Sequence, residues 1–164
     1  MCDYIYKKRN DGNLQGVYIL LKTTNLLDRY PHQVSSPFTE YKVKIGMAYA
    51  DAAKRAKQQE FASSRLANLT VNGISKTVRL YDNIDIIQIR RTSTYNEAEI
   101  LEKMYYEALH ILGGTRDYAG YKPGEWTTIP SHVCFGLKRE GFAYLSKALL
   151  EVVSSMSKLI SEEG

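Results

Sequence analysis

The chain is poor in the residues that build covalent or metal-held scaffolds. Its 164 residues include only two cysteines, Cys2 and Cys134, and three scattered histidines. A disulfide framework or a zinc site is therefore not expected, and the cysteine usage fits a reducing compartment. Long apolar runs are also missing: none follows Met1, and none approaches the roughly 18 residues of a membrane span. We therefore expect a soluble intracellular protein with no membrane partner.

What the chain does contain is an ordinary globular composition with an excess of tyrosine. Hydrophobic residues make up 44% and charged residues 24%, values that are typical of a folded domain. There are 13 tyrosines against four phenylalanines and one tryptophan, and a tyrosine offers both stacking area and a hydroxyl group. The net charge of +4 permits a polyanionic partner without requiring one.

The order of apolar and turn-forming segments predicts an α/β (α+β) domain. Residues 16–22 and 41–46 are expected to be strands, joined by a long proline-containing loop, and an alanine-rich helix is expected over 51–68. Residues 76–91 predict either a hairpin turning at Asp82-Asn83 or a short strand followed by a strong one. Thr94 and Glu97 form a capping box for a helix that runs to about Leu112.

A second long helix is expected near the end of the chain, over residues 139–161. Together these elements predict a small mixed three-stranded sheet flanked by helices, with a C-terminal helix. We expect residues 1–130 to form one domain. Residues 131–164 are expected to form a helical extension that packs on this domain or mediates dimerisation.

Several short motifs on these predicted elements occur in the order that a known protein family has them. Gly16-Val17-Tyr18 and Lys44-Ile45-Gly46, one on each predicted strand, resemble the paired motifs that name the GIY-YIG nuclease superfamily. "AAKRAK" places Arg55 nine positions after Gly46, "EAEILEKMYYEAL" resembles the glutamate helix of that family, and "GEWTTI" resembles the Glu-Trp step of its phage and viral branch. The resemblance spans residues 16–129 and implies the GIY-YIG fold and nuclease activity.

The resemblance implies a metal-dependent endonuclease that hydrolyses DNA phosphodiester bonds. Tyr18 would be the general base toward water, and Lys44 would stand where other members have a second tyrosine. From there Lys44 would either lower the pKa of Tyr18 or bind the scissile phosphate. Arg55 would grip the non-bridging phosphate oxygens with a fork that lysine cannot duplicate.

Other cations are expected to help to bind the substrate. Arg65, in "SRLANL", is an alternative to Arg55 as the essential arginine, and the chain carries Gln59 where many members have His or Tyr. The remaining substrate-binding candidates are Lys54, Lys57 and Arg116.

One carboxylate with several waters suits Mg²⁺, or Mn²⁺ in its place. Glu99 and Glu102 are the candidates on the predicted glutamate helix. At 100° per residue, Glu102 lies about 80° from the centre of the apolar stripe and Glu99 about 140° from it. Glu102 therefore borders the core, and we predict it to be the metal ligand.

Two other function classes remain open from the sequence. The same fold, departing from the family at Gln59, would serve as an inactive nucleic-acid-binding module. Alternatively, the chain would be a protein-interaction domain that forms a homodimer through its C-terminal helix, which carries an apolar stripe. The stripe consists of Phe142, Leu145, Leu149, Val152, Val153, Met156, Leu159 and Ile160.

Overall fold

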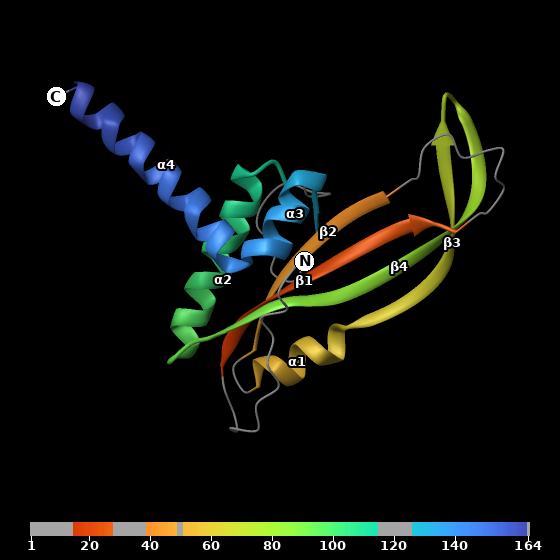
Figure 1. Ribbon diagram of the computed structural model, residues 1–164, viewed down its shortest axis with the longest axis horizontal. Coiled ribbons are helices and arrows are strands. Elements are labelled where there is room, and N and C mark those ends of the chain that lie inside the picture. The colour runs from red at the N-terminus through yellow and green to blue at the C-terminus, as the bar shows by residue number, and fades with distance from the viewer. Residues whose placement is uncertain (1–14, 28–38, 49–50, 115–125, 164) are drawn as a thin grey trace.

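A computed structural model describes residues 15–27, 39–48, 51–114 and 126–163 of the chain. In this part of the chain, five strands form one antiparallel sheet in the order β3-β4-β1-β2-β5, and helices pack against it (Figure 1). The fold is therefore α+β as predicted, but the expected mixed sheet of three strands is wrong. The elements are β1 (Gly16–Leu26), β2 (Thr39–Ala48), α1 (Ala52–Gln59), β3 (Phe61–Val71), β4 (Ile74–Arg91), α2 (Tyr95–Ile111), β5 (Thr127–Ile129), α3 (Ser131–Glu140) and α4 (Phe142–Glu163).

Strand β1 lies in the middle of the sheet and is buried on both faces. Because successive side chains of a strand point to opposite faces, Val17, Ile19 and Leu21 enter one core while Tyr18 and Leu20 enter another. The first core is the larger and contains residues of α2, α3 and α4. The second contains Ala56 of α1, so α1 covers the opposite face of the sheet. We call the face under α1 the α1 face.

The alanine-rich helix is shorter than predicted, because α1 ends at Gln59 and residues 61–71 form β3. Helix α1 buries only Ala52 and Ala56, whereas Phe61 and Leu66 lie on β3 and are 49% and 63% exposed. Strand β3 gains its backbone hydrogen bonds from β4 instead. The turn lies at Asn72-Gly73, where both residues have positive φ (54° and 79°), as a two-residue hairpin turn requires.

The 18-residue strand β4 replaces the hairpin expected at Asp82-Asn83. Asp82 pairs with Thr24 of β1 on one side and with Ser63 of β3 on the other. This pairing keeps the backbone extended through the turn-forming residues. The distal part of the β3–β4 hairpin extends away from the rest of the sheet as an arm (Figure 1).

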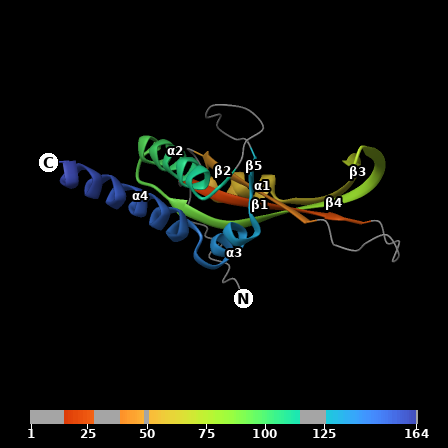
Figure 2. The same cartoon turned by 90° about the horizontal axis from the view of Figure 1, so that it is seen from above.

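The expected helix over 139–161 is two helices in the structure. Gly141 separates α3 from α4, with φ of 56°. The predicted cap of α2 is confirmed: the Thr94 hydroxyl accepts a hydrogen bond from the Glu97 backbone at 3.1 Å. Helix α4 runs outward past the end of α2 (Figure 2). None of the helices in the described ranges combines the length and the apolar character needed to cross a membrane.

Candidate active site

Tyr18 lies on the α1 face, where its phenol crosses the neighbouring strand above Gly46. The two residues are directly paired in the β1–β2 register. A Cβ atom built at Gly46 would overlap the ring and the hydroxyl of Tyr18, so only glycine leaves room for this side chain. The strand motifs around Tyr18 and Gly46 therefore form one packing unit. As a result, the Tyr18 side chain is buried, with only 2% of the residue exposed.

Helix α1 brings Arg55 to this phenol. Asp51 caps the helix by accepting a hydrogen bond from the backbone N–H of Lys54 at 3.1 Å, and Ala52 and Ala56 fix the helix on the sheet. The Arg55 guanidinium donates a hydrogen bond to the Tyr18 hydroxyl, while the arginine itself is exposed. A cation that reaches both solvent and the phenol is therefore available at this end of the sheet.

Glu102 lies on α2, which packs on the face of the sheet opposite to the α1 face. Strand β5 pairs with β2 only at residues 41–43, so in the described part of the chain it leaves the Gly46 end of β2 uncovered, and α2 packs against β2. Glu102 is 4% exposed, and its carboxylate contributes to raising the pKa of Tyr18. The Glu99 side chain is 43% exposed and pairs with Lys103 at 3.5 Å. The predicted inward orientation of Glu102 is therefore confirmed.

The pKa of Tyr18 lies above its ordinary value near 10. Burial is the largest cause, because it disfavours the charged phenolate, and the Glu102 carboxylate adds to it. The charge and the hydrogen bond of Arg55 act in the opposite direction without cancelling the effect of burial. Arg55 is thus a cation that lowers this pKa, and the suggestion that Lys44 does so stays a prediction.

Lys44 shares the α1 face with Tyr18. It pairs with Leu20, two positions along β1 from Tyr18, and residues paired across two strands point to the same face. Its ammonium group donates a hydrogen bond to Gln59 Oε1 at 3.5 Å. Arg55 and Gln59 are four residues apart and therefore lie on one face of α1. This face is turned toward Tyr18 and Lys44.

The other predicted cations lie in different places. Lys54 and Lys57 are exposed on α1, and Lys57 forms an ion pair with Glu60 at 2.9 Å. Arg65 lies on β3 rather than on a helix, and its Nε donates to Asp82 Oδ2 at 2.6 Å. Arg116 lies outside the described residues. Arg55 is therefore the arginine that contacts Tyr18.

A metal at this site would depend on a single protein carboxylate. In the described ranges, no group of three His, Cys, Asp or Glu side chains could hold an ion by itself. Magnesium retains much of its hydration and commonly uses one or two carboxylates together with substrate phosphate oxygens. Glu102, a buried carboxylate whose charge helps to raise the pKa of Tyr18, is the candidate for that protein ligand.

A second group of polar residues lies on the α1 face. Of its residues, only Arg65 was predicted from the sequence to bind substrate. The group joins Lys22 and Thr24 of β1 to Asp82 of β4, and Trp126, just before β5, borders it. The alternation of Tyr18, Leu20, Lys22 and Thr24 along β1 indicates that Lys22 faces the same side as Tyr18. No sequence signal places Trp126 there, because its position depends on the pairing of β5 with β2.

Comparisons of the chain with known proteins found no match. No protein-family model matches the chain, and neither a curated protein nor a solved structure matches it.

Proposed function

We propose that this chain is a metal-dependent endonuclease of the GIY-YIG type, which hydrolyses phosphodiester bonds in DNA. The observation that carries the proposal is the position of Arg55 at the Tyr18 phenol beside Gly46, together with the buried Glu102 of α2, whose charge helps to raise the pKa of Tyr18. Tyr18, Arg55 and Glu102 are a potential base, a phosphate-binding cation and a metal-binding carboxylate, drawn from three separate elements. Lys44 adds a second cation on the same face.

The negative charge of the phosphate determines the role of Arg55. Arg55 is exposed, and its guanidinium is hydrogen-bonded to Tyr18. On substrate binding it would turn to two non-bridging phosphate oxygens, which a planar fork binds better than an ammonium group. This movement would uncover the Tyr18 hydroxyl and open a path for the attacking water.

Tyr18 would then take the proton from that water. In its deprotonated form the phenol accepts one proton while the water oxygen bonds to phosphorus. The bond between phosphorus and the departing sugar oxygen breaks, and that oxygen takes a proton from solvent. A magnesium ion bound by Glu102 would supply charge neutralisation at the phosphate and at the departing oxygen.

A phosphate-binding module without turnover is the second candidate. It is favoured by one observation: Tyr18 is buried under Arg55 and its pKa is raised, so little phenolate exists at neutral pH. Such a module would bind DNA with a strong salt dependence and leave it intact. The two candidates therefore differ in a single measurable property, namely cleavage.

Incubation of supercoiled plasmid DNA with and without Mg²⁺ tests the proposal. We expect Mg²⁺-dependent nicking, with at least a hundredfold loss in Glu102→Gln and Arg55→Lys. Glu99→Gln and Arg139→Lys are matched controls, since Glu99 pairs with Lys103 on the helix surface and Arg139 is exposed on α3. DNA binding without nicking by the wild type, in Mg²⁺ or Mn²⁺, would favour the binding module and reject the nuclease.

A further inference from the structure

A positively charged cluster lies on the α1 face, next to the proposed active site and distinct from it. We call it the Lys22 cluster: Lys22 of β1, Lys42 of β2 and Arg65 of β3, held by Asp82 and Trp126. Lys22 lies four residues beyond Tyr18 on β1 and is paired with Lys42. At about 3.3 Å per residue, Lys22 is on the order of 13 Å from Tyr18.

The positive charges of the cluster lie close together, and their repulsion opposes folding. Lys22 and Lys42 are directly opposite one another, and like charges in this position destabilise a sheet. The pKa of Lys22 is lowered, first by burial and then by the charge of Lys42, and Arg65 acts in the same direction. Asp82 and Glu40 are the carboxylates that oppose these effects. Three cations therefore face two carboxylates, and a bound anion would relieve the excess.

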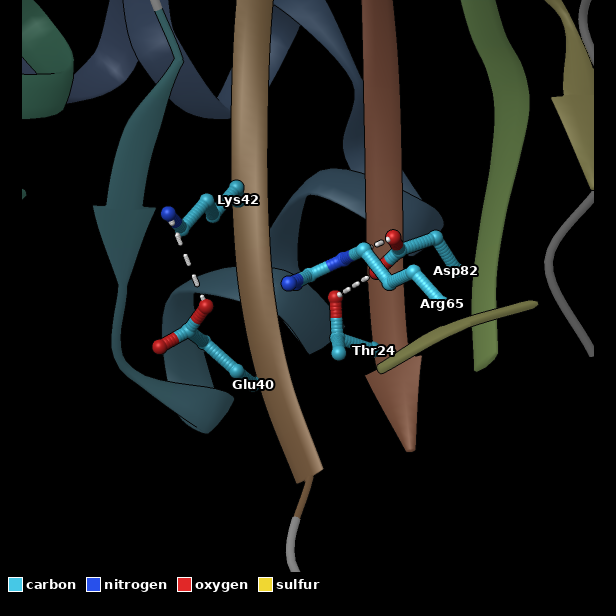
Figure 3. Close-up of polar contacts among 5 residues, drawn as sticks. All are labelled: Thr24, Glu40, Lys42, Arg65 and Asp82. Atoms are coloured by element: carbon cyan, nitrogen blue, oxygen red, sulfur yellow. Dashed lines mark hydrogen bonds and ion pairs between the residues drawn. The ribbon is translucent and has the colours of Figure 1, made fainter. Parts of the chain in front are cut away.

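Two of these cations are held in place by specific partners. Asp82 is 5% exposed and accepts hydrogen bonds from Thr24 Oγ1 and from Arg65 Nε, each at 2.6 Å. The Arg65 guanidinium consequently lies over β1 and points toward β2 (Figure 3). The Lys22 ammonium lies over the Trp126 ring, 4.5 Å from its centroid. Cations fixed before binding lose less entropy when they meet a ligand.

Lys42 occupies the outer side of the cluster. Its ammonium group pairs with Glu40 at 3.6 Å, with both side chains partly exposed, and both side chains lie on the β5 side of β2 (Figure 3). An exposed pair of this kind contributes little to stability, so Lys42 can exchange its partner at small cost. Lys44 lies two residues along β2 on the same face, between Lys42 and Gly46. The cations thus extend continuously from the Tyr18 end of the sheet to Arg65.

We infer that the Lys22 cluster binds a second backbone phosphate, so that the substrate is a polynucleotide strand running along β1 across the α1 face. This inference rests on the proposed function, and it adds a second phosphate-binding position to the site proposed there. A separation on the order of 13 Å corresponds to a phosphate a few nucleotides away from the scissile one, given about 3.4 Å of duplex axis per nucleotide. A mononucleotide or a small phosphodiester cannot reach both positions.

Two substrates of different size distinguish the role of the Lys22 cluster from that of the catalytic residues. Bis(p-nitrophenyl) phosphate is large enough only for the Tyr18 end, whereas a short DNA duplex can reach both ends. In Lys22→Gln and Lys42→Gln we expect the KM for the duplex to rise roughly tenfold, with kcat retained, and hydrolysis of the small diester to be unchanged. Each variant should also lower the slope of log affinity against log salt by about 1.

Lys147→Gln is the matched control, because Lys147 is exposed on α4, which packs on the opposite face of the sheet. If the wild type cleaves DNA and the cluster variants keep its KM and salt slope, the inference is wrong while the nuclease stands. If the wild type binds duplex without cleaving it, the nuclease fails. A reduced salt slope in the variants would then still support a backbone-binding cluster. A wild type that neither binds nor cleaves DNA would overturn both.

Discussion

At the scale of single residues, Gly46 explains why two distant strand motifs occur together. The Tyr18 phenol needs the space above residue 46, and any side chain there would occupy the same volume. The same close approach brings the phenol to the end of the sheet where Arg55 reaches it. One missing side chain therefore sets the position of the proposed base.

Gly46→Ala is expected to destabilise the fold and to displace Tyr18. Overpacking of this kind costs about 1–3 kcal/mol, and the displaced phenol should reduce plasmid cleavage more than tenfold. Urea unfolding and initial nicking rates measure the two effects. A double-mutant cycle gives the control: in a Tyr18→Ala background the stability cost of Gly46→Ala should largely disappear. An equal cost in both backgrounds would show that Tyr18 is not the residue in the way.

The raised pKa of Tyr18 predicts how cleavage depends on pH. A general base acts in its deprotonated form, and even at the ordinary pKa near 10 only about 0.1% of a phenol is ionised at pH 7. Since burial raises the pKa of Tyr18 further, kcat should increase about tenfold per pH unit from pH 7 to 9, without reaching a plateau. The residual rate of Tyr18→Phe should lose this dependence. A plateau in the wild type well below pH 10 would identify another base.

At the scale of elements, local signals predicted the segments whose sequence pattern fits one kind of element. Residues 16–22 are an apolar run, residues 41–46 alternate, and the Thr94 cap sets the start of α2; the structure has two strands and a helix there. Strand β3 was missed because its alanine-containing sequence has helical propensity, and only its pairing along β4 makes it extended. The Asn72-Gly73 turn was the available signal for that hairpin.

The residues of the candidate site, too, could be predicted from the sequence only in part. The order and spacing of the motifs singled out Tyr18, Arg55 and Glu102; in the structure Arg55 lies at the Tyr18 phenol, and Glu102 is buried on α2. Lys22 and Trp126 could not be joined by sequence alone, because their contact depends on how β1, β2 and β5 are aligned in the sheet. Strand alignment is a non-local property, and a slip of one residue would turn Lys22 to the other face.

The joint between α3 and α4 offers an element-scale prediction. Gly141 has φ of 56°, and a Cβ there would overlap the Gln88 side chain, whose Oε1 accepts the Phe142 backbone N–H at 2.6 Å. Gly141→Ala should therefore lower the free energy of unfolding by about 2–4 kcal/mol, combining backbone strain with the lost hydrogen bond. Urea unfolding provides the measurement.

Gly73→Ala is the matched control for that joint. Gly73 also has positive φ, 79°, but a Cβ there would meet no atom within 4 Å. It should cost only the backbone strain of about 1–2 kcal/mol. Equal losses in the two variants would mean that the Gln88 contact contributes nothing to the joint.

At the scale of the whole molecule, the proposed site and the end of α4 lie apart. The first part of α4 anchors it, because Phe142, Leu145 and Ala148 are buried in the larger core. The following turns carry large exposed apolar side chains, with Leu150, Val153 and Met156 between 58% and 67% exposed. Helix α4 points away from the sheet in both views (Figures 1 and 2).

Removal of residues 154–164 tests whether this end of α4 is needed for cleavage or for association between chains. We expect the shortened chain to keep its urea midpoint and its plasmid-cleavage rate within about twofold, because the buried anchor of α4 is retained and none of the proposed catalytic residues is removed. Sedimentation velocity of both chains measures association through the exposed stripe independently of cleavage. Loss of cleavage with an unchanged urea midpoint would mean that a second copy, joined through α4, contributes to the site. The interaction of Arg55 with Tyr18 within one chain argues against that requirement.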